Sequence, residues 1–275
     1  MSKNMPELPE VETIKRDLSR LIVGKKILNV TADSAKQIQP SLKKVKQAVV
    51  GTTIKKIERR AKLLLIYLDN GEILAVHLKL TGRLLVRDQA APQDDWQRVT
   101  ISLSGNKELR LADLRKFGWI KLVKDERELG RLLADFGPEP LDGLSLKIFQ
   151  EILAATARPI KVLLMDQKRI AGIGNIYASD ALFLAKIDPR RPAKSLTRAE
   201  QSRLYRAIEK VLRAGIKYRG ASDQYYLDAL GHKGLYQEHF LVYGRAGKRC
   251  LKCDKKIEKI KLAGRGTYLC PTCQK

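Results

Sequence analysis

The spacing of apolar residues changes twice along the chain. Near the N-terminus, apolar residues three and four positions apart predict an amphipathic helix from Glu10 to Leu21, opened by Pro9 and neighbouring acidic residues. Between Lys26 and Lys124 the apolar runs become short or alternate with polar residues, which is typical of strands. We expect strands at 63–68, 73–78, 84–86, 99–103 and 119–123. Because Asp69-Asn70-Gly71 is a hairpin signal and no helical period alternates with the strands, this stretch predicts an antiparallel β-sandwich.

The second half of the chain is predicted to be helical. After the prolines at 138 and 140 the helical period returns, with expected helices at 144–155, directly after Pro159, at 176–185 and at 198–212. Residues 218–243 are rich in Gly, Tyr and charge without periodicity, which favours a long functional loop. The sequence therefore predicts an α+β fold in three parts: an N-terminal antiparallel β-sandwich with flanking helices at 1–135, a helical domain with that loop at 136–243, and a cysteine module at 244–275.

All four cysteines lie in the last module. Cys250, Cys253, Cys270 and Cys273 follow the pattern Cys-x2-Cys-x16-Cys-x2-Cys. A two-residue gap lets both thiolates of a pair face one tetrahedral ion, so the two pairs predict one closed, structural Zn2+ site. Two disulfides or four unconnected thiols are the alternatives, and clustering in a cytosolic chain disfavours both.

The charge of the chain indicates a polyanionic partner. Lys and Arg number 54 against 30 Asp and Glu, and the formal net charge of +24 exceeds what solubility requires. Nucleic acid fits best because the basic residues are spread along the chain, whereas a membrane-surface protein would concentrate them in one segment. A ribosomal or RNA-binding zinc ribbon and a merely solvated basic surface are alternatives. No run approaches the ~18 apolar residues of a membrane span, and no signal-peptide pattern is present, so we expect a cytoplasmic protein without a membrane partner.

Three motifs carry a resemblance to a known family. The chain contains Pro6-Glu7-Leu8-Pro9-Glu10-Val11-Glu12 near its start, Gly172-Ile173-Gly174-Asn175-Ile176-Tyr177-Ala178-Ser179 in its helical part, and Gly264-Arg265-Gly266-Thr267 within the cysteine module. Over essentially its whole length it resembles the bacterial formamidopyrimidine-DNA glycosylases. A sister branch that prefers oxidised pyrimidines typically has Gly in place of Leu8, so the resemblance is to the oxidised-purine branch.

The resemblance implies a bifunctional DNA glycosylase and abasic-site lyase of base excision repair. Its substrates would be 8-oxoguanine and formamidopyrimidines in double-stranded DNA, together with abasic sites. Residues 136–243 would hold a helix-two-turn-helix element and a lesion-capping loop, and residues 244–275 a zinc ribbon. We expect a nucleoid-associated monomer without a protein partner. The alternatives are a specificity for oxidised pyrimidines and a damage-binding protein without catalysis.

Pro6 is the residue on which the implied chemistry depends. An N-terminal proline is a secondary amine with a pKa well below that of lysine, so near neutral pH part of it is nucleophilic. The resemblance implies that Pro6 attacks C1′ of the damaged nucleotide, that Glu7 is the acid/base, and that Glu10 supports this site. Because an internal imide nitrogen has no available lone pair, we expect the working chain to begin at Met5 and to lose that methionine, residues 1–4 being a start-site assignment or a processed extension.

Two further residues complete the implied catalytic region. Lys62 would contact phosphate and lesion and assist base removal, and Arg265 would stand at the tip of a hairpin within reach of a phosphate or a groove. His77 would lie near the bound DNA backbone, and a core histidine is an equally good interpretation of its sequence.

The remaining implied residues contact DNA. An everted nucleotide leaves a hole that side chains must fill, and the corresponding positions here hold Leu80, Arg115 and Phe117. Glycines before a helix can present backbone amides to a phosphate, and Lys161 and Asn175 would be further contacts to the DNA backbone.

Overall fold

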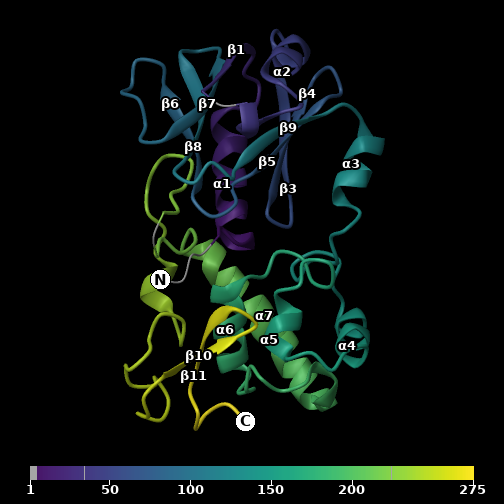
Figure 1. Ribbon diagram of the computed structural model, residues 1–275, viewed down its shortest axis with the longest axis vertical. Coiled ribbons are helices and arrows are strands. Elements are labelled where there is room, and N and C mark those ends of the chain that lie inside the picture. Colours follow the sequence, from purple (N-terminus) through teal and green to yellow (C-terminus); the bar gives the residue numbers. More distant parts are fainter. Residues whose placement is uncertain (1–4, 34, 224) are drawn as a thin grey trace.

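The N-terminal domain consists of two β-sheets packed around one helix. The computed structural model describes residues 5–33, 35–223 and 225–275. Within these residues one sheet has the order β1-β7-β8-β6 and the other the order β2-β9-β5-β4-β3. Figure 1 shows the two sheets on either side of α1 (Leu8–Leu21). The strands are β1 (Ile27–Ala32), β2 (Ile38–Gln39), β3 (Ile54–Arg60), β4 (Leu63–Leu68), β5 (Ile73–His77), β6 (Gly82–Asp88), β7 (Gln97–Leu103), β8 (Lys107–Asp113) and β9 (Trp119–Val123).

The predicted strands are present, but the expectation that no helix alternates with them is wrong. The 3-10 helix η1 (Ala35–Gln37) and the helix α2 (Leu42–Val49) lie between β1 and β3. Val45 and Val49 bury one side of α2 in the domain core. The apolar residues of α2, Leu42, Val45, Ala48 and Val49, have helical spacing, but a helix of 8 residues is too short for a sustained period. In addition, β2 pairs parallel with β9, so the sandwich is not wholly antiparallel.

The second domain is helical, as predicted. Its helices are α4 (Leu146–Ala154), α5 (Ile160–Leu164), α6 (Asn175–Leu184) and α7 (Arg198–Lys217), with α3 (Glu126–Leu133) before them and the 3-10 helix η2 (Ala193–Ser195) before α7. Helix α7 continues past the expected end at 212. It packs so closely on α6 that a Cβ at Gly215 would lie 2.5 Å from the ring of Tyr177. Apart from the 3-10 helix η3 (Tyr236–His239), the described part of 218–243 is loop.

Helix α1 belongs to both domains. Val11, Ile14 and Leu18 are buried in the core between the sheets, whereas Leu8 is buried in the core of the helical domain. The backbone N–H of Leu8 also donates to the carbonyl of Gly172 at 3.0 Å. The first turn of α1 is therefore held by the helical domain, and the following turns are held by the N-terminal domain.

A second connection between the domains is ionic. Glu139, 3% exposed, accepts hydrogen bonds from Arg59, from Arg60 Nη1 at 2.6 Å and from the backbone N–H of Ala61 at 2.8 Å. Because these donors form the turn between β3 and β4, one buried carboxylate holds that turn against the linker after α3.

The C-terminal module is a two-stranded ribbon packed on the helical domain. β10 (Glu258–Leu262) pairs antiparallel with β11 (Arg265–Leu269), and Ala263 and Gly264, both with positive φ, form the tight turn between them. β11 packs on α6, and Gln274 Nε2 donates to the carbonyl of Ile187 at 2.8 Å.

No helix in the described ranges is both long and apolar enough to span a bilayer.

The predicted α+β fold is confirmed. The domain boundaries at 135/136 and 243/244 stay a prediction.

Candidate active site and metal centre

The beginning of α1 meets the N-terminus of α6 at the junction of the two domains. Glu7 is 2% exposed, and its carboxylate accepts hydrogen bonds from the backbone N–H groups of Gly174 (2.7 Å), Ile176 (2.9 Å) and Tyr177 (3.4 Å). The first N–H groups of a helix have no partner within the helix and carry partial positive charge, so they favour a carboxylate. Glu7 is therefore the capping anion of a helix 167 residues away in the sequence.

This contact corrects one expectation. The amides before α6 were expected to face a DNA phosphate, but Glu7 occupies them. A helix N-terminus binds the anion held closest to it, and α1 holds Glu7 there. Contacts to phosphate at this point are left to side chains.

Glu10 fixes the backbone beside Glu7. Its Oε2 accepts from the N–H of Glu7 at 2.8 Å, and its Oε1 accepts from the hydroxyl of Tyr177 at 2.7 Å and from the N–H of Ala221 at 2.8 Å. Burial raises the pKa of Glu10, and the hydrogen bond from Tyr177 opposes that rise. One carboxylate thus joins α1, α6 and the loop after α7.

Lys62 supplies the positive charge of the site. It is 6% exposed and follows Ala61, whose φ of 53° turns the chain sharply between β3 and β4. Burial lowers the pKa of Lys62, and attraction to Glu7 opposes that shift. Burial raises the pKa of Glu7 to about 7, while the charge of Lys62 pulls it down. Glu7 can therefore gain or lose a proton near neutral pH, which is the property of a general acid/base.

A cleft of about 800 Å3 lies between the domains and the ribbon. Predicted residues from all three parts of the chain line it, together with two lysines of β10: Glu7, Lys62, Leu80, Asn175, Arg265, Lys259 and Lys261. Pro6 is buried and lines a separate, small pocket that also includes Glu10. The structure thus brings the predicted catalytic set into one region, three of its members around the cleft and Pro6 directly before Glu7.

Lys161 and Asn175 face the ribbon. Lys161, 1% exposed, donates to Thr267 Oγ1 at 2.9 Å, and Asn175 Nδ2 donates to the carbonyl of Gly266 at 3.2 Å. Burial lowers the pKa of Lys161 to about 7. Asn175 Oδ1 is buried without a hydrogen-bond partner in the described part of the chain. These two side chains position the turn that carries Arg265.

Two loops carry the predicted void-filling residues, and a residue absent from the sequence analysis joins them. The carboxylate of Asp113, fully buried, accepts from the N–H groups of Arg115 (3.1 Å) and Phe117 (2.7 Å). It also accepts from the hydroxyl of Thr81, the residue after Leu80. The available signal was an aspartate at the end of an apolar strand, a residue type that often accepts hydrogen bonds from the loop that follows it.

The side chains of this second loop project outward. Phe117 is 51% exposed, and the guanidinium of Arg115 lies over its ring at 4.7 Å from the centroid. An exposed aromatic side chain on a loop held by a buried carboxylate has the form of a wedge rather than of a core residue. Leu80 lines the cleft from the other loop.

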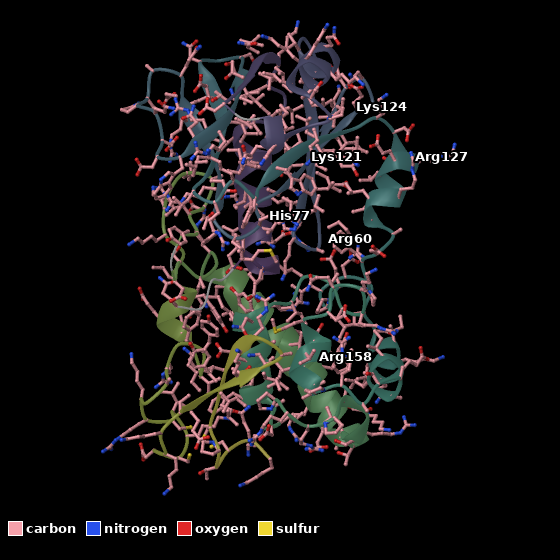
Figure 2. All side chains as sticks on the ribbon, viewed as in Figure 1. Arg60, His77, Lys121, Lys124, Arg127 and Arg158 are labelled. Carbon is pink, nitrogen blue, oxygen red and sulfur yellow. The ribbon has the colours of Figure 1, made fainter. Side chains whose placement is uncertain are left out.

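His77 lies at the border of the β domain that faces the helical domain (Figure 2). Its Nδ1 accepts from the N–H of Lys79 at 3.0 Å, which leaves the proton of a neutral ring on Nε2. Burial lowers the pKa of His77 to about 3, so the ring is neutral at physiological pH. Arg60 lies at the same border, and Arg158 lies in the helical domain (Figure 2). His77 can therefore donate a hydrogen bond from Nε2 without adding charge.

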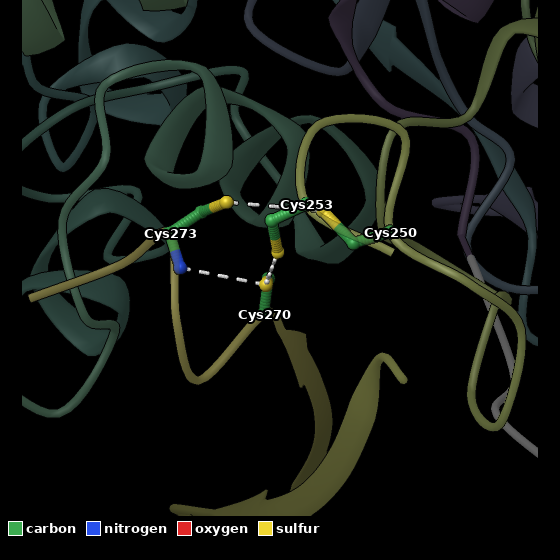
Figure 3. A group of neighbouring side chains, drawn as sticks. All are labelled: Cys250, Cys253, Cys270 and Cys273. Atoms are coloured by element: carbon green, nitrogen blue, oxygen red, sulfur yellow. Dashed lines mark hydrogen bonds between the residues drawn. The ribbon is translucent and has the colours of Figure 1, made fainter. Parts of the chain in front are cut away.

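The four cysteines converge at the base of the ribbon (Figure 3). Their Sγ atoms all lie within 4.8 Å of one another, with Cys253 and Cys270 at 3.4 Å and Cys250 and Cys273 at 3.9 Å. Four sulfurs placed tetrahedrally around Zn2+ at about 2.3 Å are separated by about 3.8 Å, so the donor set fits zinc. The four thiols are free of disulfides, and four sulfur ligands leave no position for a reacting water.

Comparison with known proteins agrees with this geometry. The models of three families match: formamidopyrimidine-DNA glycosylase N-terminal domain over residues 5–120, formamidopyrimidine-DNA glycosylase H2TH domain over 136–226, and the zinc finger found in FPG and IleRS over 247–275. A formamidopyrimidine-DNA glycosylase of Pelotomaculum thermopropionicum is 45% identical over 98% of this chain and 99% of that protein. The chain belongs to the formamidopyrimidine-DNA glycosylase family.

Solved structures of the family share the whole fold. A complex of a Lactococcus lactis FPG variant with Fapy-dG-containing DNA is 36% identical, with a TM-score of 0.92 over 98% of this chain and 100% of that one. The complex of Lactococcus lactis Fpg with DNA containing an abasic site is also 36% identical, with a TM-score of 0.92 over 98% and 99% of the two chains. The predicted family is confirmed, and the zinc-finger match together with the cysteine geometry confirms the predicted single zinc ion.

Gly174 tests the position of Glu7. A Cβ at Gly174 would lie 2.5 Å from Glu7 Oε1, so Gly174→Ala must displace the carboxylate from the amides of α6. We expect a loss of about 2 kcal/mol in the free energy of unfolding, from overpacking and a lost cap. Urea denaturation measures it. The matched control is Gly130→Ala in α3, where a Cβ meets nothing within 4 Å, so that variant should be unchanged or slightly more stable. Equal stability of the two variants would contradict the assignment.

Zinc removal tests the metal centre. Cys270→Ser replaces one buried thiolate, so the purified protein should hold well under one zinc per chain by elemental analysis and should lose ribbon stability. Thr272→Ser, at an exposed position between two of the cysteines, should retain one zinc per chain. A Cys270→Ser protein with full zinc content would exclude a four-cysteine site.

Proposed function

We propose that this chain excises oxidised purines from double-stranded DNA through the nitrogen of Pro6 and then cleaves the DNA strand. As a member of its family, it is a DNA glycosylase of base excision repair with abasic-site lyase activity. The observation that carries the proposal is the placement of Pro6 directly before a buried Glu7 with a pKa near 7, beside a cleft lined by cationic side chains. Relatives crystallised with Fapy-dG-containing and abasic DNA support the substrate class.

The proposed reaction runs through a covalent adduct. The Pro6 nitrogen attacks C1′, the glycosidic bond breaks, and the base leaves with the bonding electrons and takes a proton. The Pro6 nitrogen then loses its proton, the C1′–O4′ bond breaks, and O4′ takes a proton from Glu7, which leaves an iminium between Pro6 and the opened deoxyribose. The resulting iminium makes the C2′ proton acidic, so its removal expels the 3′ phosphate by β elimination, and a second elimination expels the 5′ phosphate. Protonated Glu7 is the acid that assists opening of the deoxyribose, and Glu10 keeps it in place through the backbone. Lys62 stabilises phosphate and the ionised form of Glu7.

The reaction requires Pro6 to be the first residue of the working chain. The match to the N-terminal family model begins at residue 5, which supports a start at Met5 followed by loss of that methionine. Residues 1–4 lie outside the described part of the chain.

The surrounding residues would hold bent DNA. Leu80, Arg115 and Phe117 would fill the hole left by the everted nucleotide. Four residues would contact the DNA backbone: Asn175 and Arg265 of the cleft, Lys161 of a second pocket that Arg265 also lines, and His77. We further propose that the enzyme works in the cytoplasm on the nucleoid.

Borohydride trapping tests the proposal. Duplex DNA with 8-oxoguanine opposite cytosine is treated with protein beginning at Pro6 and, in parallel, with protein kept from Met1, their ends checked by intact mass. Because only reduction of an imine between protein and DNA leaves the two covalently joined, a borohydride-stable adduct is expected with the Pro6 form alone. Glu7→Gln in the Pro6 form should bind the lesion duplex but release its base at least about a hundredfold more slowly. If both forms bind tightly but neither gives an adduct, the protein is a damage-binding protein without catalysis. If the Met1 form gives an adduct, the nucleophile is a residue other than Pro6.

The pH dependence tests the role of Glu7. Since the acid form is the proposed catalyst and burial raises the pKa of Glu7 to about 7, single-turnover base excision should fall as pH rises through about 7. Lys62→Met removes a positive charge that lowers this pKa, so the falling limb should move to higher pH, whatever the loss in maximal rate. Lys168→Met, which removes an exposed charge paired with Asp135, should leave the limb in place. If the excision rate of Lys62→Met falls at the same pH as that of the wild type, the titrating group is not Glu7.

A further inference from the structure

The small pocket beside Pro6 is too tight for a nucleobase. It is lined from two rigid helices by Glu10 and Ile176, from the chain start by Pro6, and from the loop after α7 by Tyr225 and Tyr226, together with Met5, Ala221 and Asp223. Its volume is about 20 Å3, which leaves room for about one water molecule. If a base is to stand beside the nucleophile, one wall must move. The helices are held by the two domain cores, so the wall that yields to a base is the loop, and the points at which the loop is attached limit how far it can move.

The loop that forms this wall is bound to the N-terminal domain as well as to its own segment, where Ser222 Oγ donates to the carbonyl of Tyr226 at 2.8 Å. β6 is the edge strand of its sheet, so its outer backbone groups are available. The N–H of Val86 donates to the carbonyl of Ala229 at 2.8 Å, and Arg87 Nη1 donates to the carbonyl of Leu230 at 3.0 Å. These bonds hold residues 225–230, here called the strap, along β6.

Arg83 binds Tyr225, the residue of this strap that lines the pocket. Its Nε donates to the carbonyl of Tyr225 at 2.7 Å, and its guanidinium lies over the ring of Trp96 at 5.4 Å. The rings of Trp96 and Tyr225 meet edge to face at 6.5 Å. Arg83 therefore contacts both the backbone of the wall and the aromatic residue that supports its side chain.

The same support is linked to the void-filling loop. The carbonyl of Trp96 accepts from the N–H of Asp113 at 2.9 Å, and Asp113 holds the N–H groups of Arg115 and Phe117. Trp96 also has a φ of 58°, a conformation that a bulky residue keeps only when its surroundings impose it. The wall of the pocket and the wedge in the duplex are thus anchored at adjoining points of one sheet.

We propose that Arg83 is a positioning residue for the everted base: it holds the Tyr225 wall at the pocket beside Pro6, so that base excision depends on it and cleavage of a preformed abasic site does not. This inference rests on the proposed function. An abasic site carries no base to place against the wall, whereas its C1′ must still reach Pro6. Loss of Arg83 should therefore separate the two activities, which a loss of DNA affinity or of fold would lower together.

The experiment compares two substrates under single-turnover, saturating conditions with the chain beginning at Pro6. One duplex carries 8-oxoguanine opposite cytosine, and the other carries a preformed abasic site at the same position. For Arg83→Met we expect about a tenfold or greater loss of 8-oxoguanine excision and abasic cleavage within about twofold of wild type. Arg83→Lys, which can still reach the Tyr225 carbonyl and the Trp96 ring as a cation, should recover part of the excision. Tyr225→Ala should resemble Arg83→Met.

The control for lost charge is Arg127→Met, at an exposed position of α3, which should leave both activities unchanged. An equal loss of both activities in Arg83→Met, or wild-type excision by it, would overturn the positioning role. Failure of the proposed function is distinguishable, because the wild-type protein itself would then not excise 8-oxoguanine, whether or not it cleaves the abasic duplex.

Discussion

The hydrogen bonds from the N-terminus of α6 to Glu7 are the interaction on which the rest of the site depends. They place a carboxylate in a fully buried position that would otherwise be unfavourable, and they do so with backbone groups that have no other partner. Because Leu8 is buried in the helical core and the next turns of α1 lie between the sheets, the same contact sets the relative position of the two domains. Glu7 is thus both a structural cap and the group proposed to transfer protons.

Burial and charge are balanced around that carboxylate. Desolvation raises the pKa of Glu7 and lowers the pKa of Lys62, and each charge opposes the shift of the other. Lys161, which binds Thr267 of the ribbon, has a pKa lowered to about 7 by burial. Glu7 attracts both lysines and Arg265 repels both, so a polyanion in the cleft would add to the attraction. The electrostatic design of the cleft and the net charge of the chain therefore have one explanation.

Distant segments share single buried acids. Glu10 joins α1, α6 and the loop after α7, Glu139 joins the turn before Lys62 to the interdomain linker, and Asp113 joins the loop of Thr81 to the loop of Phe117. In each case several backbone N–H groups or arginines converge on one carboxylate, which fixes loops more firmly than packing of their few apolar residues could. Loops that must meet DNA are in this way held without covering their exposed side chains.

The sequence by itself determined what depends on spacing within a short segment. Strand and helix periods, the hairpin after β4, the paired cysteines and the Pro6-Glu7 motif are local, and the described structure has the expected elements. It adds the helices α2 and α3, which at 8 residues each are too short for a sustained period. Only the tertiary structure decided which groups meet. That Glu7 rather than a phosphate caps α6, that Asp113 binds Thr81, and that Arg83 binds the carbonyl of Tyr225 each depend on contacts between separate segments. No local pattern encodes such contacts, because one carboxylate or guanidinium has many possible partners until packing selects among them.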